Sequence, residues 1–193
     1  MLSIRFHGRG GQGTVIASKL LAAAMFEEGW QVQAFPSFGA ERSGAPVAAF
    51  LRADRTPITA HYQVYEPDHV VVLDPVLLKT IDVTAGLRRG GWVLVNAPYE
   101  PGELRPGAAR PLAGSHFAVA TCDATKIALA HGLGSRTTPI VNTAMAGAFA
   151  ACTGLVSLAS VLRVMPSFVP AHADANGRAA RDAFDATLLC QVR

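Results

Sequence analysis

A glycine-rich turn between a predicted strand and a predicted helix is the feature that most constrains the fold of this sequence. Residues 4–7 form a short strand-like segment, four glycines fall within residues 8–13, and an alanine-rich helical stretch begins at Thr14. Glycine permits a tight turn, and a helix that starts immediately after it directs unpaired amides and its positive dipole end toward one point. The segment therefore predicts either a site for a phosphate-bearing ligand or a turn that only allows close packing of the helix on the strand.

The glycine spacing also fits the fingerprint of dinucleotide-binding folds, Gly8-x-Gly10-x-x-Gly13. That fingerprint expects an acidic residue about 20 positions further on, which holds a ribose hydroxyl. The strand predicted at 31–35 ends without one, and the next acidic side chain, Glu41, lies in a loop beyond it. A stand-alone Rossmann-type nucleotide-binding reductase is thus an alternative that the missing acid weakens.

Composition indicates a single domain, residues 1–193, with part of its surface covered by another protein. Half of the residues are hydrophobic and only 16% are charged, against about a quarter in an average domain. The net charge of +3 comes from scattered arginines, without a basic run interleaved with aromatic residues. We therefore expect an anionic ligand and no nucleic acid.

The cysteines and the longest apolar stretch exclude several classes of protein. Cys122, Cys152 and Cys190 lie far apart, so they predict no disulfide framework, no iron–sulfur cluster and no metal site in this chain, and they favour the reducing cytoplasm. No secretory signal is visible at the N-terminus. The apolar stretch 140–162 is interrupted by polar residues and by Gly154, which predicts a buried helical hairpin and no membrane span.

Strands and helices alternate along the chain, which predicts an α/β fold: a three-layer α/β/α sandwich around a Rossmann-like open sheet. Asp74, at the end of a β-branched run, is expected to cap the helix that follows it, and Asp123 to cap another. The strands are predicted at 2–7, 31–35, 47–52, 69–74, 92–96 and 116–121, and the helices at 14–28, 123–131, 139–162 with a break at Gly154, and 173–189.

A second loop, residues 36–46, follows the strand at 31–35. Ligands of open α/β sheets bind at the carboxyl ends of strands, so this loop and the glycine turn should face one crevice, where Arg42 could reach a phosphate. Alternatively, Glu41 and Arg42 are solvated neighbours and Phe38 belongs to the core.

No catalytic residue is predicted. The six histidines are dispersed, and no Ser/His/Asp or Cys/His arrangement or G-x-S-x-G elbow can be assembled. His7 alone ends a strand beside the glycines. Because no partner for it can be identified, packing or turn-capping is favoured over a role as general base.

Three segments together carry a resemblance to a known family: His7-Gly-Arg-Gly-Gly-Gln-Gly13, Phe35-Pro-Ser-Phe-Gly-Ala-Glu-Arg-Ser-Gly-Ala-Pro-Val47 and Asp68-His-Val-Val-Val-Leu-Asp74. The chain resembles the gamma subunit of 2-oxoacid:ferredoxin oxidoreductases of the pyruvate type. The resemblance implies a complex that decarboxylates a 2-oxo acid oxidatively and transfers the acyl group to coenzyme A. It also implies alpha-type and beta-type subunits that hold thiamine diphosphate and Mg, and a ferredoxin-like subunit with [4Fe-4S] clusters. The gamma-type chain would not be active alone.

The resemblance also implies a set of coenzyme A contacts that close the shared active site. The glycine turn would meet the anionic part of coenzyme A, and the second loop would line the adjoining wall. Many relatives have two arginines after the glutamate, whereas Ser43 follows Arg42 here, which removes one fixed charge. The expected contact residues are Gly8, Arg9, Gly10, Gly11, Gln12, Gly13, Phe38, Glu41 and Arg42.

Overall fold

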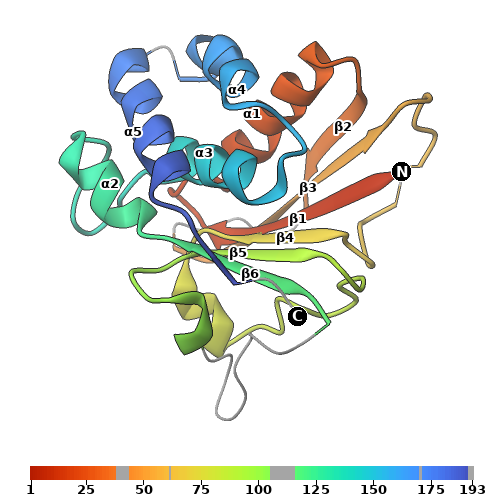
Figure 1. Ribbon diagram of the computed structural model, residues 1–193, viewed down its shortest axis with the longest axis horizontal. Coiled ribbons are helices and arrows are strands. Elements are labelled where there is room, and N and C mark those ends of the chain that lie inside the picture. The colour runs from red at the N-terminus through yellow and green to blue at the C-terminus, as the bar shows by residue number, and fades with distance from the viewer. Residues whose placement is uncertain (38–43, 61, 105–115, 170, 191–193) are drawn as a thin grey trace.

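The computed structural model describes residues 1–37, 44–60, 62–104, 116–169 and 171–190, and these residues form one mixed β-sheet with helices (Figure 1). Across the described sheet the strands lie in the order β2, β3, β1, β4, β5, β6, β7. Their bounds are β1 Leu2–Arg9, β2 Gln31–Pro36, β3 Pro46–Asp54, β4 His69–Val72, β5 Trp92–Asn96, β6 Ala118–Cys122 and β7 Leu188–Cys190.

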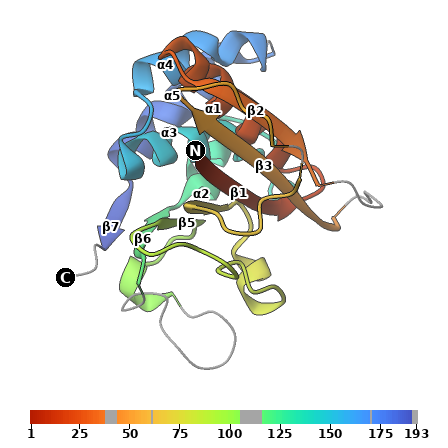
Figure 2. The same cartoon turned by 90° about the vertical axis from the view of Figure 1, so that its right-hand side faces the viewer.

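The helices lie unequally on the two sides of this sheet. The five α-helices of the described residues stack on one side, called here the helix side, and the short 3-10 helices η1 and η2 lie on the other, the turn side (Figures 1 and 2). The α/β class is confirmed, but the turn side lacks a described layer of α-helices. The helices are α1 Thr14–Glu27, α2 Ala124–Ala130, α3 Asn142–Thr153, α4 Leu158–Val164, α5 Ala173–Asp185, η1 Pro75–Lys79, η2 Pro101–Glu103 and η3 Met165–Ser167.

Small residues let the helices of the helix side approach closely. A Cβ atom added at Gly147 of α3 would lie 2.0 Å from the carbonyl oxygen of Ala180 in α5. Ala144, Ala148 and Ala179 are also fully buried in this part of the core. The alanine enrichment of the sequence therefore serves the contact between α3 and α5, because interiors pack tightly and tolerate little added volume.

The sheet combines a parallel half and an antiparallel half. β1, β4, β5 and β6 are parallel neighbours, and their valine-rich residues are buried on both sides, as expected for covered parallel strands. β2 and β3 form an antiparallel hairpin, and β3 is antiparallel to β1. The carboxyl ends of β1 and β2 therefore lie at the same edge of the sheet, as the sequence predicted.

The end of the chain differs from the prediction of a helix over 173–189. The last helix stops at Asp185, and Leu188–Cys190 form β7, antiparallel to β6. The Thr187 hydroxyl donates to the carbonyl of Ala183 at 2.6 Å, which satisfies one carbonyl of the last helical turn. Leu188 and Leu189 complete the sheet edge while remaining about half exposed.

The predicted helical hairpin is confirmed, with α3 ending at Thr153, Gly154 in the left-handed conformation (φ 63°), and α4 following. Its first helix begins at Asn142, three residues after the expected start at Pro139. Asp74 and Asp123 cap the segments after them, but Asp74 caps the 3-10 helix η1 and not an α-helix. Within the described residues, no helix has the length and apolarity needed to cross a membrane.

Candidate anion site at the glycine turn

At the glycine turn, the connections that follow neighbouring strands run to opposite sides of the sheet. The chain leaves β1 through the turn and enters α1 on the helix side, whereas it leaves the parallel neighbour β4 through Asp74 and enters η1 on the turn side. In open α/β sheets, such a switch point at the carboxyl ends of two strands is where ligands bind. The turn therefore occupies the favoured position for a ligand in this fold.

Two of the turn glycines are required by close packing. A Cβ atom at Gly8 would lie 2.1 Å from Oγ1 of Thr14, and one at Gly13 would lie 2.6 Å from Nδ2 of Asn142. Gly11, like Gly13, has a positive φ (99° and 80°), but it differs in its surroundings, because the nearest atom to an added Cβ is Thr138 Cγ2 at 3.3 Å. The packing interpretation thus holds for Gly8 and Gly13, and Gly11 is open to a ligand role.

The turn is stabilised by contacts among three of its neighbouring side chains, those of Arg9, Gln12 and Asp74. The Arg9 Nε atom lies 3.0 Å from a carboxylate oxygen of Asp74, and the Gln12 side-chain amide donates to the same oxygen at 3.2 Å. The Gln12 side-chain oxygen in turn accepts the Arg9 backbone amide at 2.8 Å. Asp74 also accepts the Val76 amide at 2.9 Å. Arg9 and Gln12, two of the expected coenzyme A contacts, therefore both contact the carboxylate of Asp74, for which the sequence favoured a capping role over a place in the crevice.

Several backbone amides of the turn remain available. Among the described residues, the amides of Gly11, Gly13 and Thr14 donate to no protein acceptor. α1 has no side-chain cap and no acidic residue in its first turn, so its first amides are left for another acceptor. The Thr14 hydroxyl is buried and also lacks a partner among the described residues. This arrangement can bind an anion.

Asn142 and Thr138 lie beside the turn, and sequence reasoning did not select them as site residues. The first residue of α3 is Asn142, so the N-termini of α1 and α3 meet at the turn. Asn142 is buried, and its side-chain oxygen accepts the Thr143 amide at 2.8 Å. A polar side chain at the start of an apolar helix was the one signal in the sequence that could have indicated this residue.

The second loop ends next to the glycine turn and starts at the same edge of the sheet, one strand further away. The Gly10 amide donates to the carbonyl of Ala45 at 3.0 Å, and Pro46 is paired with Arg9 in the β3–β1 ladder. The loop's other end, Ser37, donates its amide to the carbonyl of Ala48 at 2.8 Å. Three expected contact residues of this loop, Phe38, Glu41 and Arg42, fall outside the described part of the chain, so their roles remain predictions.

His7 accepts a hydrogen bond within the fold. It is buried on the turn side of β1, where the Arg5 Nε–H donates to its Nε2 at 3.0 Å. Burial, aided by the positive charge of Arg5, lowers the pKa of His7 to about 4. At neutral pH the ring is neutral and its Nε2 lone pair is already used, which agrees with the packing role that the sequence favoured.

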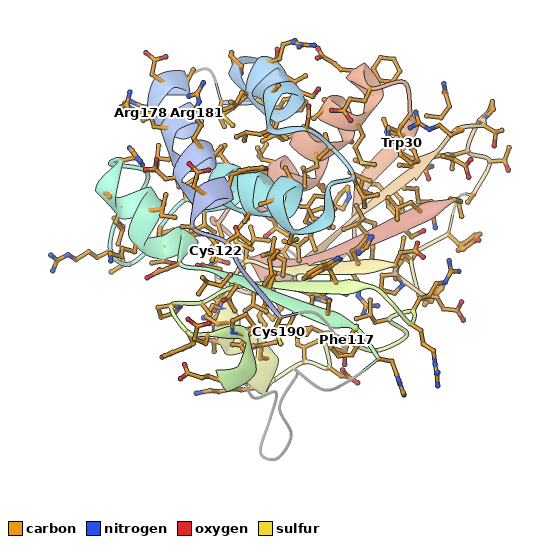
Figure 3. The ribbon with its side chains drawn as sticks, viewed as in Figure 1. Trp30, Phe117, Cys122, Arg178, Arg181 and Cys190 are labelled. Atoms are coloured by element: carbon orange, nitrogen blue, oxygen red, sulfur yellow. The ribbon has the colours of Figure 1, made fainter. Side chains whose placement is uncertain are left out.

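Two of the three cysteines, Cys122 and Cys152, are buried, and Cys190 is partly exposed. Burial raises the pKa of the Cys122 thiol to about 11 and that of the Cys152 thiol to about 12. Figure 3 labels Cys122 on β6 and Cys190 on β7, at different places along the two paired strands. In the described part of the chain, no three His, Cys, Asp or Glu side chains gather where they could hold a metal ion.

Comparisons with known proteins agree with the fold. Residues 3–186 match the family model described as pyruvate ferredoxin/flavodoxin oxidoreductase. The chain is 50% identical to the pyruvate/ketoisovalerate oxidoreductases common subunit gamma of Thermococcus kodakarensis over all of both chains, and 48% identical to the pyruvate synthase subunit PorC of Methanothermobacter marburgensis over 96% of this chain and 97% of that one. The crystal structure of the pyruvate oxidoreductase subunit PORC of Thermotoga maritima is similar, with a TM-score of 0.78, 36% identity and 98% of each chain covered. The chain therefore belongs to the pyruvate ferredoxin/flavodoxin oxidoreductase family, as the gamma subunit of a multi-subunit 2-oxoacid oxidoreductase.

Proposed function

We propose that this gamma subunit binds the anionic part of coenzyme A at the glycine turn and thereby closes the active site of its complex. The complex would decarboxylate a 2-oxo acid oxidatively and join the acyl group to coenzyme A. The observation that carries the proposal is the set of amides at Gly11, Gly13 and Thr14 that have no acceptor among the described residues, at the start of a 14-residue helix. Phosphate is the ligand that such a turn favours.

The contacts of Asp74 with Arg9 and Gln12 determine which groups would hold the phosphate. Asp74 already engages the Nε atom of Arg9 and the side-chain amide of Gln12, so the amides and the α1 dipole supply most of the attraction. Arg9 remains partly exposed, with 37% of its side chain accessible, and its terminal nitrogens can still point to an anion. Phe38, Glu41 and Arg42 would form the adjoining wall, and Ser43 follows Arg42 where the resemblance implies a second arginine in many relatives.

The other cofactors belong to partner chains in this proposal. The two buried cysteines of this chain have raised thiol pKa values, and thiolates are the ligands that iron–sulfur clusters need, so Cys122 and Cys152 do not fit a cluster. Thiamine diphosphate, when bound in the partner subunits, supplies carbanion chemistry. The partners would be alpha-type and beta-type subunits and a ferredoxin-like subunit, and the chain would work in the cytoplasm.

A nucleotide-binding reductase is less well supported by the sheet. In the dinucleotide fold a parallel second strand lies next to β1 and carries the ribose-binding acid. Here the antiparallel β3 takes that place, and β2 lies beyond it. We therefore expect no micromolar binding of NADH or NADPH in a fluorescence titration of the purified chain.

Gly11→Ala in the assembled complex tests the proposal. Alanine at a φ of 99° distorts the turn and moves its amides, so the KM for coenzyme A should rise by about tenfold, while kcat changes little. Gly154→Ala is the matched control, because Gly154 also has a positive φ (63°), with open space around it, at the far end of α3. Both variants should lose roughly 1 kcal/mol of stability.

An unchanged KM in the Gly11→Ala complex would remove the turn from the coenzyme A site. A rise in KM that Gly154→Ala reproduces would show that general destabilisation is the cause. The isolated wild-type chain should show no 2-oxo acid oxidation, and turnover by it would contradict the assignment as a dependent subunit.

A further inference from the structure

Arg52 is a buried cation on the turn side of β3. Its side chain is the largest of those that are almost completely buried, with 1% of the residue exposed. Two aromatic rings enclose it, since its guanidinium carbon lies 5.1 Å from the ring centroid of Phe35 and 4.8 Å from that of Tyr62. These contacts fix the guanidinium at the boundary between the hairpin β2–β3 and the segment that follows β3.

No carboxylate among the described residues pairs with Arg52. Its terminal nitrogens donate to neutral oxygens, those of the Gln33 side chain at 2.9 Å and of the backbone carbonyls of Ala60 and Tyr62, and its Nε has no acceptor. Burial lowers the pKa of this guanidinium, although arginine stays charged at neutral pH. Burying a charge without a counter-ion costs free energy, so buried charges in proteins are usually paired.

The neighbouring charges are already used. The amino group of Met1 pairs with Asp54 at 2.9 Å, and Arg88 pairs with Glu66 at 3.5 Å and with Asp68 at 3.3 Å. Once these pairs are formed, Arg52 is the cation of this region that has no anionic partner among the described residues. The formal charges named here balance, three positive and three negative, so the region carries no excess charge, and what distinguishes it is a single buried cation without a direct anionic contact in the described part of the chain.

A cavity leads to this cation from the surface. It has a volume of about 240 Å³ and is bordered by Tyr62 and Tyr65, of which 60% and 68% are exposed. Its further lining residues are Met1, Ser3, Arg52, Val64, Glu66 and Arg88. Exposed tyrosines around a pocket that ends at an arginine are typical of the central contacts of protein interfaces.

We infer that this cavity receives an aspartate or glutamate side chain from another subunit of the complex, whose carboxylate pairs with the Arg52 guanidinium while Tyr62 and Tyr65 pack around it. The size of the cavity favours a side chain over a free metabolite, because small-molecule pockets usually measure about 300 Å³ or more. Membership of a multi-subunit family provides such a partner, and the low charge content of the chain agrees with a covered surface.

The first test measures assembly of the full-length chain with its partner subunits by a binding titration. Arg52→Met keeps an apolar stem among the rings but removes the charge, so the affinity should fall by about tenfold or more. Arg55→Met is the matched control. Arg55 also stacks on an aromatic ring, that of Trp30 at 3.9 Å, but it is exposed and lies outside the cavity, so its affinity should stay within about twofold.

The second test does not depend on a buried residue. Tyr65→Ala removes an exposed ring, so folding should be unaffected while assembly weakens by about fivefold. Wild-type affinity in both Arg52→Met and Tyr65→Ala would overturn the inference, and if Arg52→Met fails to fold, Tyr65→Ala alone decides. Micromolar binding of a free 2-oxo acid carboxylate to the isolated chain, abolished in Arg52→Met, would also overturn it, because the occupant would then be a small molecule.

Discussion

The two sides of the sheet differ in the interactions that stabilise them. The helix side is held by apolar contacts between small residues, and Gly147 and Ala180 allow α3 and α5 to touch through their backbones. The turn side carries polar groups on β1 and β3, of which the partly buried Arg5 donates to the carbonyls of Val83 and Ala85 at 2.9 and 2.7 Å. On the helix side, close apolar packing predominates and is joined by a few buried hydrogen bonds. On the turn side, the polar groups of β1 and β3 depend on hydrogen-bond partners far away in the sequence.

The contact between α3 and α5 gives the strongest test of this contrast. Gly147→Ala places a Cβ atom 2.0 Å from a backbone carbonyl oxygen, so the free energy of unfolding should fall by about 3 kcal/mol, the upper end of typical overpacking costs. Gly177→Ala in α5 is the control, because its added Cβ would meet no atom closer than 3.6 Å. That variant should gain about 0.5–1 kcal/mol through helix propensity. Equal losses in chemical denaturation would refute the packing argument.

His7 tests the turn side through pH. Because its folded pKa is about 4 and its unfolded value is 6.5, the unfolded chain binds more protons between these values. The stability contribution is complete above pH 6.5 and is lost as the pH falls through 4, by roughly 3 kcal/mol for this group. His7→Gln should flatten the slope of unfolding free energy against pH.

Part of that slope should persist in His7→Gln, because burial also lowers the pKa of His69. His116→Gln, at an exposed position, is the control. A wild-type slope in His7→Gln would show that His7 is not the group responsible.

The smallest expected change in the free energy of unfolding is at Thr121. Its hydroxyl, on the turn side of β6, is buried without a partner among the described residues, so Thr121→Val should be neutral or stabilise by up to about 1 kcal/mol. Thr143→Val is the contrasting variant on the helix side, since the Thr143 hydroxyl donates to Asn176 at 2.8 Å, and it should lose about 1 kcal/mol. A loss of stability in Thr121→Val would point to an acceptor beyond the described residues.

The same contrast explains how far the sequence predicted the fold. The strand, glycine turn and helix of residues 2–27 and the break at Gly154 follow from local signals, so they were predicted nearly as found. β7 has three residues without alternating burial, and only pairing with β6 makes it a strand, so the helical pattern before it was extended too far.

For the site, the sequence predicted the turn but not what supports it. Glycine spacing is local, whereas the pairing of Arg9 with Asp74 joins residues that only the parallel neighbours β1 and β4 bring together. The approach of Asn142 to Gly13 likewise depends on how α3 packs against α1. Such contacts are tertiary, and neither periodicity nor propensity encodes them.

The place of β7 also has a consequence for biosynthesis. The outer edge of β6 has no described partner strand until residues 188–190 have left the ribosome, and α5, which covers α3, is made only shortly before them. Between the synthesis of β6 and that of β7, nascent chains therefore carry an open sheet edge, and α3 stays uncovered until α5 is made, a state in which edge pairing with other chains is a hazard. Folding helpers that shield strand edges should matter more for the yield of this subunit than its small size suggests.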